Sequence, residues 1–178
     1  KGYEILYMTD EIDEFVVKVI HDYKEKEFKS VSDENMNEAE TDEEKEAMKK
    51  AEDENKDLLT FIKETLGAKV SEVTLSSRLK DSPCCLTSKG GISLEMEKTI
   101  NKMPTDESIK AEKVLEMNPD HAVMKKLQET FAKGDGAEGK DLTATYARLL
   151  YDQALLISGL TIDDPAKLGE DICRVITE

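Results

Sequence analysis

The feature that most constrains the fold is a helix-length segment near the end of the chain, residues 141–158, in which apolar side chains occupy almost every side. Arg148, Asp152 and Gln153 are its main polar interruptions. A helix that faces water on one side needs only a single apolar stripe. This segment must therefore lie in the centre of its own domain or be covered in part by another chain.

A second amphipathic helix follows this segment. Gly159 ends the first helix, and the run Asp163-Asp164-Pro165 is typical of a helix start. The apolar residues of the second helix recur at helical spacing, at Leu168, Ile172, Val175 and Ile176. Two antiparallel helices that share an apolar face form half of a four-helix bundle, and a two-fold axis would supply the other half. The pattern alone leaves dimerisation and internal packing equally open.

Strand-like and helix-like segments alternate in the rest of the chain, which predicts a mixed fold. The expected strands span residues 3–8, 28–31, 70–76, 83–87 and 113–117. The expected helices span residues 9–23, 41–66, 93–103 and 120–131. The first strand, helix and strand together predict a βαβ unit with a right-handed crossover.

Local signals mark where several of these elements begin and end. Thr9 or Asp10 can cap the first helix and Asp120 a later one, because their side chains accept hydrogen bonds from free backbone N–H groups. Gly67 suits a left-handed helix end. The sparse apolar content of residues 32–42 indicates a loop. A second, flexible loop is expected around Gly134, Gly136 and Gly139.

Charge and hydropathy exclude two classes of partner. The chain has 25 Lys and Arg residues against 40 Asp and Glu, a formal net charge of -15, so binding to nucleic acid is not expected. No apolar run approaches the ~20 residues of a membrane span, so no membrane partner is expected either. Residues 33–56 hold 11 acidic and 4 basic side chains, a pattern typical of a solvated connecting helix.

The cysteine and histidine residues give little support to an enzymatic function. Cys84, Cys85 and Cys173 are too few for a disulfide framework, which favours a reducing cytoplasm. Adjacent Cys84 and Cys85 would point to opposite faces of a strand, which argues against a shared metal. A thiol enzyme that uses one of them remains a weak alternative. Neither His21 nor His121 has neighbours that predict catalysis.

Several segments resemble, in order, the C-terminal part of heat shock protein 90 chaperones. They are KGYEILYMTDEIDEF at 1–15, FKSV at 28–31, SRLKDSPCC at 77–85, LEMNPDH at 115–121 and LLYDQALL at 149–156, followed by Ser158-Gly159 and Asp164-Pro165. The chain opens with Lys-Gly-Tyr and ends after its last helix without an acidic tail. We therefore expect a piece of a bacterial family member, of the high-temperature-protein-G type.

The resemblance implies an α+β fold in three parts. Residues 1–45 would end the small α/β subdomain of the middle domain, residues 46–67 would form a charged connecting helix, and residues 68–178 would form the C-terminal dimerisation domain, with a small sheet and a helical hairpin. ATP and Mg would bind in a missing N-terminal domain, so no cofactor, metal or catalytic residue is expected in this piece.

The resemblance also implies two interaction surfaces. The last two helices would form a four-helix bundle across a homodimer, through Tyr146, Leu149, Leu150, Ala154, Leu156, Ile157, Leu168, Ile172, Val175 and Ile176. The helix near residue 96 would expose apolar residues to unfolded or partly folded client proteins, through Ile92, Met96, Ile100 and Met103. From the spacing alone, this second stripe is better explained as part of a core. The alternative function is that of a monomeric acidic adaptor, which binds one partner through its apolar helix.

Overall fold

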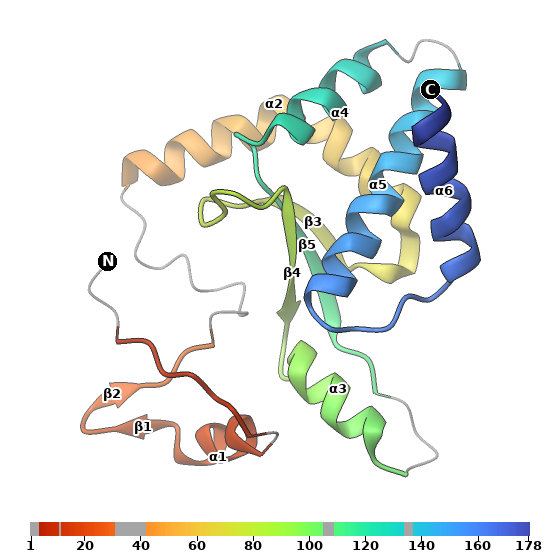
Figure 1. Ribbon diagram of the computed structural model, residues 1–178. Helices are drawn as coiled ribbons and strands as arrows, with labels where there is room; N and C mark the ends of the chain where they lie inside the picture. The colour runs from red at the N-terminus through yellow and green to blue at the C-terminus, as the bar shows by residue number, and fades with distance from the viewer. Residues whose placement is uncertain (1–3, 11, 31–41, 105–108, 134–136) are drawn as a thin grey trace.

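A three-stranded sheet forms the centre of the larger part of the chain, as the computed structural model shows (Figure 1). Its strands are β3 (Glu72–Leu75), β4 (Cys84–Lys89) and β5 (Glu112–Met117), in the order β3-β5-β4. β3 runs parallel to β5, and β4 runs antiparallel to it. The structure describes residues 4–10, 12–30, 42–104, 109–133 and 137–178.

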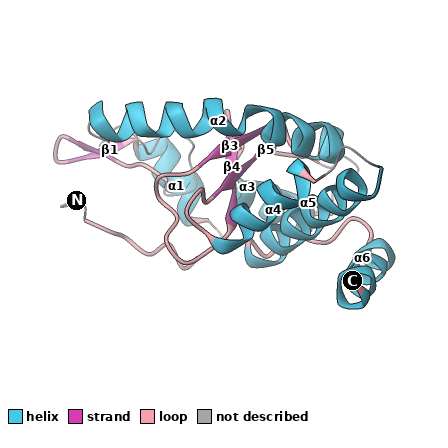
Figure 2. Ribbon diagram, turned by 90° about the horizontal axis from the view of Figure 1, so that it is seen from above, coloured by secondary structure: helices cyan, strands magenta, loops and turns pink. Residues whose placement is uncertain are grey.

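Helices cover this sheet, in agreement with the α+β class predicted from the sequence (Figure 2). The helices of this part of the chain are α2 (Asp42–Leu66), α3 (Leu94–Lys102), α4 (Ala122–Ala132), α5 (Ala137–Ile157) and α6 (Pro165–Thr177). Of these, α3 lies beyond one end of the sheet rather than over it (Figure 1). α2 packs on β3, and α5 packs on β4 and against α2 and α4, while α6 lies outermost and packs on α5. The apolar segment that most constrained the fold therefore lies between the sheet and the last helix.

The core joins residues from all of these elements except α6. The buried side chains include Leu58, Ile62 and Leu66 of α2, Leu115 and Met117 of β5, Met124 and Leu127 of α4, and Ala147, Leu150, Tyr151, Ala154 and Leu155 of α5. The charged helix α2 thus contributes to the core through its second half, although it carries exposed charges along its whole length. Burial of this apolar area is the main force that holds the helices on the sheet.

Most predicted helix ends are confirmed. Gly67 has a φ of +58° after α2, and the side chain of Ser93 accepts a hydrogen bond from the N–H of Met96 at 3.0 Å. The prediction that Asp120 caps α4 is wrong, since His121 Nδ1 accepts from the N–H of Val123 at 3.2 Å. The reason is local: Asn118 Oδ1 accepts the N–H of Asp120 at 3.0 Å, and this turn delays the helix start by one residue.

The N-terminal segment differs from the predicted βαβ unit. α1 (Asp13–Ile20) is followed by a hairpin of two short antiparallel strands, β1 (Asp22–Tyr23) and β2 (Lys26–Glu27). The two residues between them, Lys24 and Glu25, have φ angles of 51° and 64°, which is the geometry of a tight hairpin turn. A two-residue turn forces antiparallel pairing, so no crossover forms here. Residues 4–9 form no strand.

Two smaller predictions are also wrong. Thr9 and Asp10 do not cap α1; instead Asp13 Oδ2 accepts hydrogen bonds from both of their N–H groups, at 3.0 and 3.1 Å. Gly139 lies inside α5 rather than in a loop, because that helix begins four residues earlier than expected, at Ala137. Of the loop predicted at residues 32–42, only Asp42 is described, and it begins α2 instead. Residues 32–41 and the glycines Gly134 and Gly136 fall outside the described residues.

Candidate interaction surfaces on the last two helices and on α3

The hairpin of α5 and α6 is held together by a bidentate ion pair. Arg148 of α5 donates from Nε to Asp171 Oδ2 at 2.6 Å and from Nη2 to Asp171 Oδ1 at 2.9 Å. The side chain of Asp171 is only 3% exposed, whereas that of Arg148 is 26% exposed. The sequence marked Arg148 only as an interruption of an apolar helix, and the structure shows that this interruption joins the two helices.

A second ion pair connects the same two helices at a more exposed position. Arg174 of α6 lies 2.6 Å from Asp141 of α5, and the side chain of Asp141 is 60% exposed. Exposed pairs contribute little to stability because water screens them. The two pairs therefore differ in importance, although they join the same helices.

The contact with Arg148 and burial both shift the pKa of Asp171, in opposite directions. The hydrogen bond from Arg148 lowers the pKa of Asp171 below its ordinary value of 3.8, against the opposing effect of desolvation. Asp171 is therefore ionised at neutral pH, and its charge is matched inside the hairpin. The charge of Asp171 is thus not available to a partner on the outer side of these helices.

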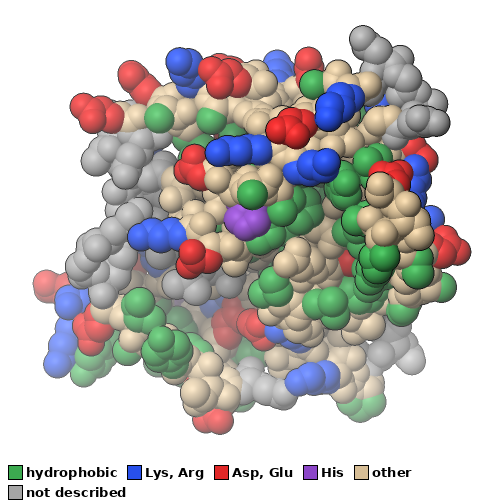
Figure 3. All heavy atoms as spheres, turned by 45° about the horizontal axis from the view of Figure 1, so that its top comes forward, with side chains coloured by type: hydrophobic (Ala, Val, Ile, Leu, Met, Phe, Trp, Pro, Cys, Tyr) green, Lys and Arg blue, Asp and Glu red, His purple; other side chains and the backbone are tan. Residues whose placement is uncertain are grey.

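Four large apolar side chains of the hairpin are exposed. Leu156 and Ile157 at the end of α5 are 58% and 66% exposed, and Ile172 and Ile176 of α6 are 44% and 77% exposed. Figure 3 shows hydrophobic side chains gathered on the right of the molecule, the side on which α5 and α6 lie in Figure 1. Contiguous apolar surface of this kind marks interaction sites in soluble proteins.

The structure divides the predicted dimer residues into two groups. Leu150 and Ala154 are buried in the core of this chain, at 6% and 1% exposure, so they hold α5 against the rest of the chain. The remaining members face outward or are half-buried: Tyr146, Leu149, Leu156, Ile157, Leu168, Ile172, Val175 and Ile176. We call this second group, with Leu142, the outer hairpin face.

The dimer residues predicted from the sequence did not include Leu142. It lies seven residues before Leu149 and fourteen before Leu156, so the three leucines follow one line along α5, and Leu142 and Leu149 are half-buried. A spacing of seven is the signal that could have revealed it.

A shallow groove of about 210 Å³ lies beside this line of leucines. It runs between α4 and α5 and is lined by Val123, Lys126, Leu127, Tyr146, Leu149, Leu150 and Gln153. Its lining is mainly apolar, so it extends the outer hairpin face towards α4.

The predicted client-binding residues do not share one environment. Ile92 packs against the core, Met96 and Ile100 are half-buried, and Met103 is 49% exposed. Lys18 of α1 reaches this region, where its Nζ donates to Gly91 O at 2.9 Å and lies 2.7 Å from Met96 Sδ. The exposed part of the stripe is thus centred on the end of α3.

The cysteines have the character of structural thiols. Burial raises the pKa of Cys84 to about 12, and burial together with Glu116 raises that of Cys85 to about 11. Cys84 Sγ donates to the carbonyl of Leu150 at 3.3 Å. A thiolate nucleophile needs a lowered pKa and access to solvent, so neither thiol suits nucleophilic catalysis.

We predict that only Cys173 reacts quickly with a disulfide reagent at neutral pH, since it is exposed while Cys84 is buried. Cys84 and Cys85 should react at least about a hundredfold more slowly until the protein unfolds. Time-resolved titration with Ellman's reagent measures this, and a Cys173→Ser variant should lose the fast phase. A fast phase that persists in that variant would restore the thiol-enzyme hypothesis.

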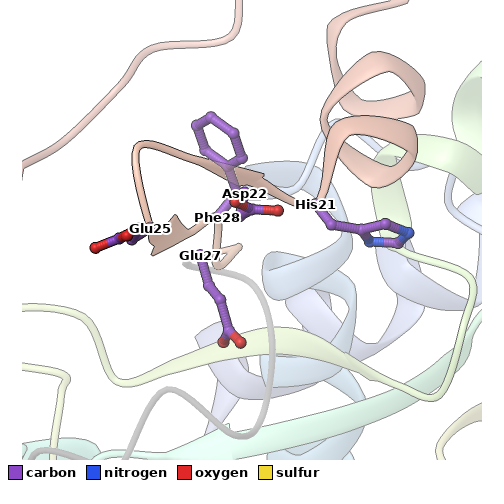
Figure 4. Close-up of a pocket in the computed structure, with 5 residues that line it drawn as sticks. All are labelled: His21, Asp22, Glu25, Glu27 and Phe28. Carbon is purple, nitrogen blue, oxygen red and sulfur yellow. The ribbon is translucent and has the colours of Figure 1, made fainter.

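A hollow at the N-terminal hairpin has no convergent chemistry. It measures about 580 Å³ and is lined by His21, Asp22, Glu25, Glu27 and Phe28. Figure 4 shows these side chains pointing in different directions from the turn rather than toward one another. Among the described residues there is no group of His, Cys, Asp and Glu side chains that could hold a metal ion.

Comparison with known proteins decides the family. The family model described as Hsp90 protein matches residues 1–178. The chain belongs to the Hsp90 family. The resemblance carried by the quoted segments is therefore confirmed.

Members of the Hsp90 family named Chaperone protein HtpG match almost all of this chain. Those of Clostridium acetobutylicum, Clostridium botulinum (strain Loch Maree) and Bacillus subtilis are 48%, 49% and 46% identical to it over 99% of its length. The chain spans only about 27% of the length of these relatives. No helix in the described part of this Hsp90-family chain is both long and apolar enough to cross a membrane.

Proposed function

We propose that this chain is the module that joins two copies of an Hsp90-family chaperone, through the outer hairpin face. The observation that carries the proposal is the combination of internally paired charges with exposed Leu156, Ile157, Ile172 and Ile176 on the last two helices. The relatives are named as chaperones over a length nearly four times that of this chain, so the module serves a larger molecule.

The proposed dimer is a four-helix bundle with two-fold symmetry. Each copy supplies α5 and α6, and identical faces meet across the axis. A specific interface of standard size buries about 1,600 Å² in total. The line of leucines on α5 and the isoleucines on α6 provide apolar residues at the spacing that bundle packing uses.

The proposed mechanism is mechanical. A permanent link raises the effective concentration of the two attached chaperone arms to roughly millimolar. Contact between the arms then becomes an intramolecular step, whose equilibrium ATP binding elsewhere in the chaperone can bias. Nucleotide chemistry belongs, in this proposal, to the part of the chaperone outside this chain.

We also propose that α3 contributes to the binding of unfolded or partly folded clients. The supporting observation is that Met96 and Ile100 lie on α3, at the edge of the domain, and that Met103 follows directly as the C-cap residue, at spacings of i, i+4 and i+7 (Figure 1). Methionine is unbranched and polarizable, so it adapts to partners of varied shape. Ile92 serves the core instead.

The mass of the chain in solution tests the main proposal. We expect twice 20.0 kDa in sedimentation experiments down to low micromolar concentration. A single 20.0 kDa species at high concentration would contradict dimerisation. It would favour the alternative, a monomeric acidic adaptor that uses the same apolar helices for one partner.

A further inference from the structure

α3 is attached to the rest of the domain mainly through polar atoms. Its two buried side chains are Leu94 and Glu97, at the start of the helix. An amphipathic helix at the surface of a domain ordinarily turns its apolar stripe inward. α3 differs, since a charged residue occupies the inner side while Met103 faces solvent.

The carboxylate of Glu97 makes three hydrogen bonds to the segment that leads into β5. Lys113 Nζ donates to Glu97 Oε1 at 2.9 Å and to Oε2 at 2.6 Å. The N–H of Ala111 donates to Glu97 Oε2 at 2.8 Å. The side chains of Glu97 and Lys113 are only 11% and 9% exposed, so this ion pair is removed from water. Breaking a buried pair from one side is strongly unfavourable because it leaves the other charge unmatched.

Asn101, one helical turn further on, holds the same segment by two more hydrogen bonds. Its Nδ2 donates to Ile109 O at 2.9 Å, and its Oδ1 accepts the N–H of Ile109 at 3.0 Å. The side-chain amide thus pairs with both backbone groups of one residue, as a neighbouring strand would.

The spacing of Glu97 and Asn101 along α3 matches the spacing of their partners along the extended segment. One turn of helix from residue 97 to 101 advances about 6 Å, and two residues of extended chain advance about 6.6 Å. Residues 109, 111 and 113 alternate along that segment and so meet the same side of the helix. We call Glu97 and Asn101, together with Ile109, Ala111 and Lys113, the α3 latch.

The latch determines which way the apolar stripe points. Met96 precedes Glu97 and Ile100 precedes Asn101 by one residue each, and adjacent residues lie about 100° apart around a helix. With Glu97 and Asn101 fixed against the segment at 109–113, the side of α3 that carries Met96, Ile100 and Met103 is turned away from it.

We propose that Glu97 and Asn101 are positioning residues that hold α3 in the orientation in which it presents Met96, Ile100 and Met103 to client proteins. The proposal rests on the client-binding role of α3 put forward above. A free helix of nine residues is marginal in water. Without the latch, α3 frays or turns its stripe onto the domain, and binding loses a preformed surface.

The test compares Glu97→Ala with Glu95→Ala in the full 178-residue chain. Both variants replace glutamate by alanine on the same helix, but Glu95 is exposed and forms its ion pair with Lys98. Hydrogen exchange at the N–H groups of Ile109 and Ala111 should accelerate roughly tenfold in Glu97→Ala and little in Glu95→Ala. Asn101→Ala, which leaves no buried charge unpaired, should accelerate exchange at Ile109 and provides a second variant if Glu97→Ala folds poorly.

Binding of reduced, carboxymethylated α-lactalbumin, a permanently unfolded chain, provides the functional readout. Glu97→Ala and Asn101→Ala should weaken it about tenfold, and Met103→Ser should weaken it comparably. The double variant Glu97→Ala/Met103→Ser should bind no more weakly than either single variant, because latch and stripe act through the same surface. A purely structural role for the latch would instead give additive losses.

Three results would overturn the proposal in distinguishable ways. Equal exchange rates in the Glu97→Ala and Glu95→Ala variants would show that the latch does not hold α3. Faster exchange with unchanged binding, while Met103→Ser weakens binding, would show that the latch holds α3 without serving clients. If Met103→Ser binds as the unaltered chain does, the client-binding role of α3 itself fails, and the positioning role fails with it.

Discussion

Replacing Ile172 by aspartate should turn the proposed dimer into a monomer at micromolar concentration. Ile172 is 44% exposed on α6 and lies on the outer hairpin face, so a two-fold partner would cover it. An unpaired charge in such an interface costs several kcal/mol, and the symmetric dimer contains the substitution twice. The dissociation constant should therefore rise by more than about a thousandfold. Sedimentation across a dilution series measures the change.

The neighbouring residue provides the matched control. Cys173 is also exposed on α6, but lies about 100° further round the helix than Ile172 and is not one of the apolar residues of the outer hairpin face. Cys173→Asp introduces the same charge into the same helix and should leave the dimer intact. If Ile172→Asp remained dimeric, or if both variants dissociated equally, the interface would lie elsewhere or would not depend on this face.

Replacing Arg148 by methionine should destabilise the monomer fold by about 3 kcal/mol, because it leaves the buried carboxylate of Asp171 without its bidentate partner. Lys167 Nζ, 3.5 Å from Asp171 Oδ1, compensates in part. Urea denaturation, compared with the unaltered chain, measures the loss. Arg174→Met is the control: it removes an arginine–aspartate pair between the same helices, and should cost below about 1 kcal/mol because Asp141 is exposed.

The pH dependence of the same pair gives a second measurement. The pKa of Asp171 is lower in the folded chain than the ordinary value of 3.8 that applies after unfolding. Its contribution to stability is therefore fully present above about pH 4 and is lost as the pH falls through the folded value. The difference in the free energy of unfolding between the unaltered chain and the Asp171→Asn variant should become smaller as the pH is lowered toward about 3. A difference independent of pH would mean that the ion pair does not stabilise the fold.

The N-terminal segment illustrates why part of the fold could not be predicted. The apolar pattern of residues 4–9 suits a strand, yet a strand needs a neighbour for its backbone groups, and no neighbour is present among the described residues. Periodicity reports which side chains avoid water, but not which backbone segment will pair with them. The tight turn at Lys24 and Glu25 shows the same limit, because neither residue type signals a positive φ.

The candidate surfaces were predicted in outline and changed in detail. The all-round apolar character of α5 left open a central position in its own domain or cover by another chain, and the structure places α5 between the sheet and α6. The pattern also grouped the outer residues with Leu150 and Ala154, which the core of this chain covers. Spacing places residues around a helix, but only packing shows which sides have neighbours within the chain. Whether a second copy covers the rest stays a prediction.

By itself, the sequence determined the family, the α+β class, the strands of the main sheet and most helix ends, because these depend on local pattern, capping residues and ordered motifs. Only the tertiary structure decided the roles of isolated charges. Glu97 and Arg148 resemble ordinary charged residues on their helices, yet one holds α3 to the segment before β5 and the other joins α5 to α6. Their partners are 16 and 23 residues away. Interactions over such separations are set by how the elements pack, and no local pattern in the chain encodes them.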